Sequence, residues 1–216
     1  MRMSRALTSV GGMVLTWDEE RAAFADAAAW FAHVLAQVDE RWGEPALGEW
    51  DVRALAGHTS RALITVEQYL ERPASAVDIA SADEYYRVTG QLSRGDEVPA
   101  RGRAAGVALG DDPAAAVAEL IERVVPLVDD CDGIELVSTV AGGMRLDAYL
   151  PTRTFELVVH TADLARALSV QAEVPETSAR SALAVASELA IGAHAAADVL
   201  FALTGRAALP AGFTLI

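Results

Sequence analysis

The sequence predicts a mainly α-helical protein: a helix bundle with a small β-hairpin and an additional long C-terminal helix. Two observations support this prediction. Alanine dominates the chain, and long stretches lack both glycine and proline, which is a composition typical of helices. In the first such stretch, apolar residues recur at alternating steps of four and three, which is the spacing of a seam between packed helices.

The first two helices are expected at residues 18–41 and 51–71. The seam of the first consists of Phe24, Ala28, Phe31, Leu35 and Val38. Glycines and a proline between residues 43 and 48 separate the two helices, and Pro73 ends the second. An apolar stripe marks the inner face of the second helix: Val52, Leu55, Thr59, Leu63, Val66 and Leu70.

A long excursion with room for one or two short helices follows at residues 74–110. The third helix is expected to begin at Asp112 and Pro113, because a capping residue followed by a first-turn proline is a typical start. Its expected core face is Val117, Leu120, Ile121, Val124 and Leu127. Two short β-compatible runs between residues 134 and 149 then predict a hairpin around residues 141–143.

The last two helices are expected at residues 151–169 and 176–203, with Gly205 as the C-terminal cap of the second. We expect residues 1–12 to be a disordered leader and residues 13–216 to be a single domain. The most apolar stretch, residues 181–203, contains Glu188, His194 and Asp198, so a bilayer-spanning helix is not expected there. The default location is therefore the cytoplasm.

Composition excludes several classes of function. The 216 residues include 17 basic and 31 acidic side chains, which gives a net charge of −14. Nucleic acids and anionic membranes are bound by basic surfaces, so we expect neither as a partner. A single cysteine excludes an intramolecular disulfide and a multi-cysteine metal cluster.

Four ionisable residues share one face of the helix expected at residues 151–169. Arg153, Glu156, His160 and Asp163 follow one another at steps of three, four and three. A Glu and a His four residues apart can both bind one cation, and Asp163 could then hold the second imidazole nitrogen or contact a substrate. The same residues also fit an ordinary solvated face with two ion pairs. The spacing alone leaves both interpretations open.

A metal site would need a third ligand from another helix, and His58 is the candidate. It lies at the edge of the inner stripe of the second helix, although a lone histidine in such a place is more often a core residue. His33 is expected to pack at the edge of the seam, and His194 to form a buried pair with Asp198. Cys131 has no histidine nearby in sequence to activate it, so we expect a structural role.

Two segments resemble a known family. Trp50 to His58 resembles its W-x-V-x-x-L-x-x-H segment, and Pro151 to Leu164 resembles its R-x-x-E-x-x-x-H-x-x-D-L segment. This is the mycothiol-dependent maleylpyruvate isomerase family, in the wider DinB/YfiT-like superfamily of metal-binding four-helix bundles. The order of the elements agrees over nearly the whole chain from Met13 onward.

The resemblance implies a DinB-like up-down four-helix bundle in which His58, Glu156 and His160 bind a divalent metal, usually zinc. It also implies that Asp163 takes part in catalysis and that mycothiol is the thiol cosubstrate. Three protein ligands leave a position open, and a thiol that coordinates there loses its proton. Attack of the thiol on a small electrophilic substrate would then give isomerisation or transfer of sulfur.

The characterised isomerase carries a further C-terminal domain. Here the second motif is followed by one long helix and a tail, so we expect a substrate other than maleylpyruvate. Several residues of the excursion could line a different pocket or be ordinary loop residues: Tyr85, Tyr86, Arg87, Arg101 and Arg103. Two other functions stay open: a non-catalytic binding module with a relic metal site, whose apolar last helix could form a homodimer, and a metal hydrolase that uses bound water.

Overall fold

The computed structural model describes residues 15–92, 97–171 and 173–216. The predicted disordered leader, residues 1–12, lies outside the described residues. Within them the chain is mainly helical and carries a small hairpin, which confirms the predicted fold class. No helix in this part of the chain combines the length and the apolar character that crossing a bilayer requires.

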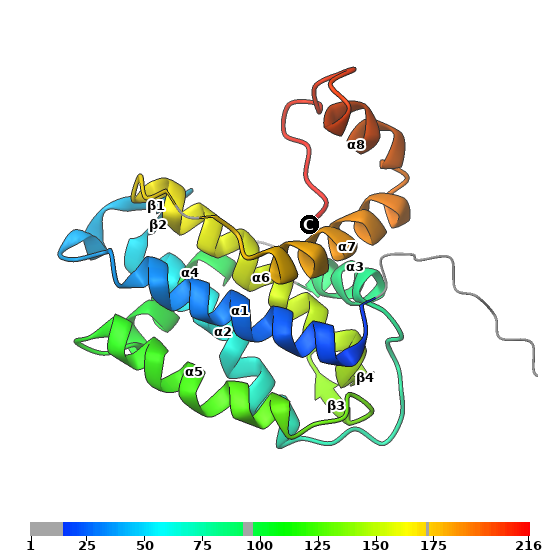
Figure 1. Cartoon of the computed structure of the whole chain (residues 1–216), viewed down its shortest axis with the longest axis horizontal. Helices are drawn as coiled ribbons and strands as arrows, with labels where there is room; N and C mark the ends of the chain where they lie inside the picture. The colour runs from blue at the N-terminus through cyan, green and yellow to red at the C-terminus, as the bar shows by residue number, and fades with distance from the viewer. Residues whose placement is uncertain (1–14, 93–96, 172) are drawn as a thin grey trace, which may run out of the picture.

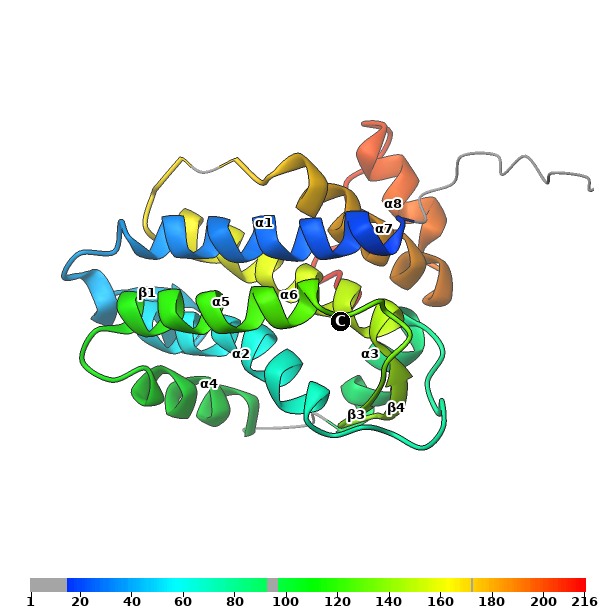
Figure 2. The same ribbon diagram turned by 60° about the horizontal axis from the view of Figure 1, so that its bottom comes forward.

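Four helices form the bundle: α1 (Trp17–Leu35), α2 (Val52–Leu70), α5 (Pro113–Asp129) and α6 (Leu146–Ala167). Both α1 and α2 pack against α5 and α6. Figures 1 and 2 show that α1 and α6 run in one direction along the bundle and that α2 and α5 run in the other. Parallel neighbours such as α2 and α5 need a long connection, and the excursion between them supplies it.

The seam predicted for the first helix lies at the centre of the core, and all five of its residues are buried. The helix itself ends earlier than expected, at Leu35. Asp39 adopts a left-handed backbone conformation, with φ of 51°, which is incompatible with continued helix. A short 3₁₀ helix, η1 (Arg41–Gly43), follows the turn.

Aspartate caps begin two of the bundle helices. The carboxylate of Asp51 accepts a hydrogen bond from the Ala54 amide at 2.7 Å, and Asp112 accepts one from the Ala115 amide at 3.0 Å. The predicted start of the third helix is thereby confirmed. The core face predicted for this third helix included Leu127, which was wrong. Leu127 is exposed, and its neighbour Val128 is buried in the core instead.

The excursion contains two helices, α3 (Ala82–Leu92) and α4 (Glu97–Ala108). Helix α4 lies against α2 at very close range: a Cβ atom added to Gly57 would lie 2.1 Å from the backbone nitrogen of Gly106. The indole nitrogen of Trp50 also donates a hydrogen bond to the Pro99 carbonyl at 3.0 Å. These contacts fix α4 beside the start of α2.

Two small antiparallel sheets complete the fold. Strands β3 (Leu136–Thr139) and β4 (Gly142–Arg145) form the predicted hairpin, and β1 (Pro45–Leu47) pairs with β2 (Trp50–Asp51) in a sheet that the sequence did not predict. Strand β4 leads directly into α6, so that helix begins before the predicted start at Pro151. The proline lies inside the helix, where it removes one backbone hydrogen bond.

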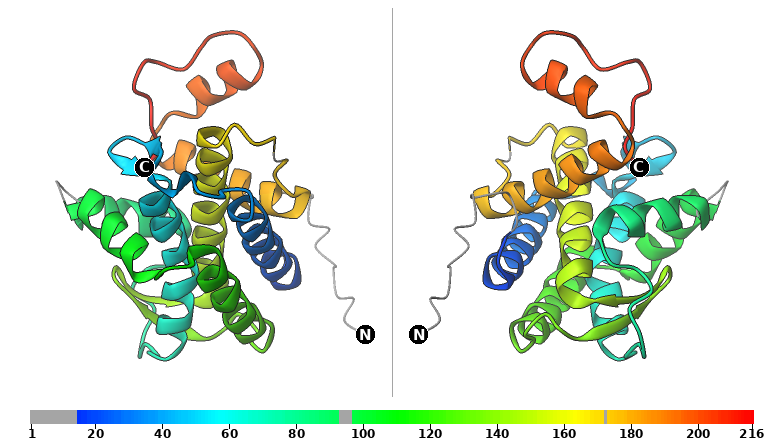
Figure 3. Two further views of the ribbon diagram at one scale, coloured as in Figure 1. Left: turned by 90° about the vertical axis from the view of Figure 1, so that its left-hand side faces the viewer. Right: turned by 90° about the vertical axis from the view of Figure 1, so that its right-hand side faces the viewer.

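The single C-terminal helix predicted at residues 176–203 is instead two helices, α7 (Glu176–Gly192) and α8 (Ala196–Leu203). The break lies at His194, whose φ is 58°, and the Ala195 amide bonds the Ala190 carbonyl at 2.8 Å, as in a Schellman end. Helix α7 packs on α1 and α6, whereas α8 buries none of its residues and stands away from the bundle (Figure 3).

Candidate metal centre

The three predicted ligands come together between α2 and α6. His58 lies in the first half of α2, and Glu156 and His160 lie one turn apart on α6. One potential ligand atom from each lies within 4.8 Å of the other two. The two imidazole rings meet edge to face, with their centroids 4.8 Å apart. The packing of α2 on α6 therefore assembles a donor set from two distant parts of the chain.

The ionisable stripe of α6 faces the interior. The side chains of Glu156 and His160 are only 18% and 12% exposed, and Arg153 is buried. The alternative interpretation of this stripe as a solvated face is therefore wrong. Burying these ionisable side chains costs free energy because they lose contact with water. Buried ionisable groups of this kind concentrate at functional sites.

His160 is held from both sides by carboxylates. Its Nδ1 lies 3.3 Å from Oδ2 of Asp163, and its Nε2 lies 3.2 Å from Oε2 of Glu156. Burial lowers the pKa of His160, but the hydrogen bonds to Asp163 and Glu156 outweigh burial and raise that pKa overall. A carboxylate only accepts, so Nδ1 carries a proton toward Asp163. A cation held by His160 and Glu156 would have to displace the proton that these two side chains share.

Glu156 stays ionised despite its burial. Burial alone would raise its pKa, but the hydrogen bond with His160 and the positive charge of Arg153 lower that pKa well below its usual range. The Tyr86 hydroxyl donates a further hydrogen bond to Oε1 of Glu156 at 2.8 Å. The carboxylate is thus both charged and oriented.

His58 is the neutral member of the set. Burial, and secondly the nearby His160, lower its pKa to about 4. Its Nδ1 is buried and has no hydrogen-bond partner among the described residues, and the ring packs 4.5 Å from that of Trp50. Two imidazoles and a carboxylate are a donor set that suits zinc, and a buried nitrogen without a partner suits a ligand. The residues present therefore fit a divalent ion.

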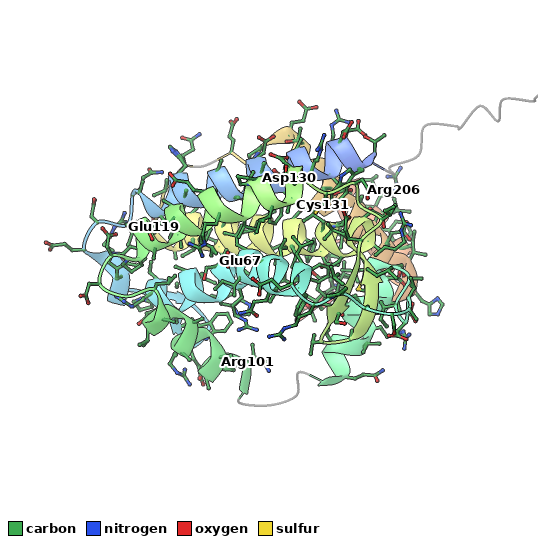
Figure 4. All side chains as sticks on the ribbon, turned by 90° about the horizontal axis from the view of Figure 1, so that it is seen from below. Glu67, Arg101, Glu119, Asp130, Cys131 and Arg206 are labelled. Atoms are coloured by element: carbon green, nitrogen blue, oxygen red, sulfur yellow. The ribbon has the colours of Figure 1, made fainter. Side chains whose placement is uncertain are left out.

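A cavity of about 590 Å³ adjoins the three ligands. Its lining combines α2, α3 and α6 with single residues from elsewhere: His58, Arg61, Ala62, Thr65, Tyr69, Tyr85, Tyr86, Thr89, Arg101, Val140, Arg153 and Glu156. Figure 4 shows Arg101 at the end of α4 that faces α3. Three of the five excursion residues considered for a pocket thus line it. The other two, Arg87 and Arg103, form ion pairs at the surface with Glu84 and Glu49.

Sequence reasoning missed the contribution of α2 to this cavity. Arg61, Thr65 and Tyr69 follow His58 at steps of three, four and four, which places all of them on one helical face. That spacing was a usable signal. It was obscured because the apolar stripe of the same helix is the stronger pattern.

The remaining histidines and the cysteine lie elsewhere. His33 and His194 are exposed, so the predicted packing of His33 is wrong, and so is the buried pair of His194 with Asp198, which is exposed too. Cys131 follows the end of α5 (Figure 4). Burial, and then the charge of Glu135, raise the pKa of its thiol to about 11. A thiol of this kind is a poor nucleophile at neutral pH.

A comparison with models of protein families shows which family the chain is related to. The model described as the mycothiol maleylpyruvate isomerase N-terminal domain matches residues 17–165, from the start of α1 to near the end of α6. Comparisons with curated proteins and with solved structures gave no match. The matched part includes the whole donor set and all four bundle helices. The chain therefore belongs to the mycothiol maleylpyruvate isomerase N-terminal domain family.

Proposed function

We propose that the protein is a metal-dependent enzyme that uses mycothiol as a cosubstrate for attack on a small electrophilic molecule. His58, Glu156 and His160 would hold the metal, for which zinc is the proposed ion. The convergence of these three side chains to within 4.8 Å is the observation that supports the proposal most directly. The family relationship supports the thiol, and the reaction would be a transfer of sulfur or an isomerisation.

A divalent ion in this place would act as a Lewis acid and favour the thiolate form of a thiol that coordinates it. The protein's own residues prepare the site. Asp163 fixes the His160 ring with Nδ1 protonated, which leaves Nε2 as the ligand atom. Tyr86 orients Glu156, and the adjoining cavity has room for an electrophile. Cys131 is unsuited to be the nucleophile, so the sulfur would come from outside.

Metal binding is the first test. After loading with zinc and removal of excess ion, elemental analysis of the wild-type chain should find about one ion per chain. His58→Ala and His160→Ala should lose it. His33→Ala and His194→Ala are matched controls, because both side chains are exposed, and they should retain the ion. A wild-type protein without metal after this treatment would contradict the proposal.

Turnover is the second test. The zinc-loaded protein is mixed with mycothiol and a panel of electrophiles, and the loss of free thiol is followed. The proposal expects thiol consumption that disappears in His160→Ala. Turnover of a substrate without added thiol would instead indicate a hydrolase. A zinc-loaded protein that consumes no thiol would favour a non-catalytic binding module.

We also propose that the protein acts in the cytoplasm. A thiol cosubstrate must stay reduced, and the cytoplasm keeps thiols reduced. Activity recovered in the membrane or secreted fraction of fractionated cells would contradict this location.

A further inference from the structure

A second cavity, of about 620 Å³, lies where the start of α1, the segment that leads into α3, the start of α6 and helix α7 meet. Figure 1 shows α3 and α7 beside each other at the end of the bundle where α1 begins. This cavity is similar in volume to the one beside the proposed metal ligands, and the two share no lining residue. The proposed function makes no use of it.

The lining of the second cavity is mainly apolar, with walls that include Trp17, Ala148 and Val185. Among its described lining residues, every charged side chain is a carboxylate: Glu20, Asp83, Asp147 and Glu188. Asp147 pairs with Arg145 at 2.6 Å, whereas the other three form no ion pair with a described residue. An apolar lining with excess negative charge indicates a ligand that has an apolar body and a positive charge.

The carboxylate of Glu20 is the most deeply buried of these charged groups, with only 8% of the residue exposed. The Ser181 hydroxyl donates a hydrogen bond to Oε2 of Glu20 at 2.7 Å, and Oε1 accepts none from a described residue. An ionised carboxylate can accept about four hydrogen bonds. Burying it without an opposite charge costs free energy. A cation in the cavity would supply both the missing donors and the missing charge.

Two further features of the cavity suit a cation. Glu188 is exposed at the edge, where it adds a second negative charge without a partner among the described residues. Trp17 adds an aromatic ring, which is fixed by the hydrogen bond that its indole nitrogen donates to the Cys131 carbonyl at 2.9 Å. Aromatic rings attract organic cations through the negative charge of their faces.

We propose that this cavity binds a small organic cation, namely a protonated amine on an apolar body, and that the ammonium group pairs with Glu20. A protonated amine donates hydrogen bonds and carries the charge opposite to that of the carboxylate, and such charge-assisted hydrogen bonds are stronger than neutral ones. Binding at this place requires neither a metal nor a thiol, so the site does not depend on the proposed function.

Benzylamine and benzyl alcohol are the probes for this site, because they share an apolar body and differ in charge at neutral pH. NMR titration of the full chain measures both dissociation constants. We expect benzylamine to bind roughly tenfold more tightly than benzyl alcohol. Glu20→Gln should abolish this difference, because it removes the charge and keeps the shape. Glu122→Gln is the matched control, because Glu122 is exposed on α5 outside the cavity, and it should keep the full preference.

Glu188→Gln is a second variant, which covers the case in which Glu20→Gln does not fold. Glu188 is exposed, so this variant should fold normally and weaken benzylamine binding about threefold without affecting benzyl alcohol. The same titration locates the ligand. The methyl signals of Ala148 and Val185 should shift, whereas those of Val140, which lines the cavity beside the proposed metal ligands, should not.

Equal affinity of the wild type for the two probes would overturn the proposal. An undiminished preference for benzylamine in both glutamate variants would also overturn it, because the amine would then be binding elsewhere. Shifts confined to Val140 would have the same meaning, since they would place the amine in the first cavity.

Discussion

The contact between Asp163 and His160 leads to the first prediction at the scale of single residues. Asp163→Asn removes the charge that holds the Nδ1 proton of His160, so zinc affinity should fall by roughly 10- to 100-fold, as is usual for residues that orient a metal ligand. Competition with a chromophoric chelator measures this change. Asp147→Asn is the control on the same helix, because Asp147 pairs with Arg145 and should leave zinc affinity unchanged.

Glu20 gives a prediction about pH and stability. It is buried in α1, where burial raises the pKa of its carboxyl even though the Ser181 hydroxyl donates to it at 2.7 Å. Because the pKa of the Glu20 carboxyl is higher in the folded protein than in the unfolded one, folding is more favourable when this carboxyl is protonated. This favourable contribution is present below the unfolded pKa and is lost as the pH rises through the folded pKa.

Glu20→Gln should therefore unfold at a higher temperature than the wild type at pH 7, by an amount on the order of 1 kcal/mol in stability. The difference should shrink as the pH falls toward 4. Thermal unfolding at a series of pH values measures it. Glu19→Gln is the opposite case, because hydrogen bonds from Thr16 lower the pKa of Glu19, and this change should lower stability at pH 7. A Glu20→Gln protein that is less stable at every pH would contradict the argument.

Residue spacing predicted part of the candidate site. Glu156 and His160 share a face because four residues make about one helical turn, and this holds whatever the helix packs against. Whether that face meets the interior depends on the partner helix, which periodicity does not reveal. The same limitation explains the errors at His33 and Leu127: both lie at the edge of an apolar stripe, where a small helix rotation decides exposure.

At the scale of elements, the crossing of α2 and α4 depends on two glycines in contact. A Cβ atom on Gly57 would lie 2.1 Å from the Gly106 backbone nitrogen, and backbone at that distance can only move away. Gly57→Ala should destabilise the protein by roughly 1–3 kcal/mol or more, measured by urea unfolding.

Gly90→Ala is the control for this prediction. No described residue lies within 4 Å of the position that its Cβ would take in α3, so the change should stabilise the protein by about 0.5–1 kcal/mol through a lower unfolded-state entropy. Equal effects of the two substitutions would show that helix propensity, and not the close crossing, controls stability here.

Some helix boundaries could be predicted from the sequence, and others could not. The starts of α2 and α5 were predicted well because Asp51 and Asp112 supply local caps. The break between α7 and α8 was missed because alanine-rich sequence fits a continuous helix, and a non-glycine residue, His194, takes the left-handed position that ends α7. Helix propensity alone does not predict where a helix ends, because the surrounding structure can override it.

Exposed apolar side chains are frequent on the C-terminal elements of the molecule, and we propose that a second copy of the chain covers them. Seven large apolar side chains on α7, α8 and the tail are 42–76% exposed: Leu183, Ile191, Leu200, Phe201, Leu203, Leu209 and Ile216. Residues 189–216 carry only Asp198 and Arg206 as charged groups, so two strongly acidic chains can meet there without repulsion.

The protein should therefore form a homodimer through this surface. An eight-residue helix without buried residues is not stable alone in water, which is a further reason to expect a partner for α8. Sedimentation velocity should show a dimer at micromolar concentration for the wild type and a monomer for the double variant Leu200→Gln, Leu203→Gln. Leu127→Gln, on the exposed side of α5, should remain dimeric. A monomeric wild type at every concentration would contradict the prediction.

The order of side chains along α6 has a consequence for selectivity among electrophiles. Arg153 and His160 lie seven positions apart on one rigid helix, which is a rise of about 10 Å. If one end of a substrate is held beside Arg153 and sulfur is delivered beside His160, the helix fixes the number of bonds between the held group and the reacting carbon. In a homologous series of electrophiles, the rate should then peak at one chain length.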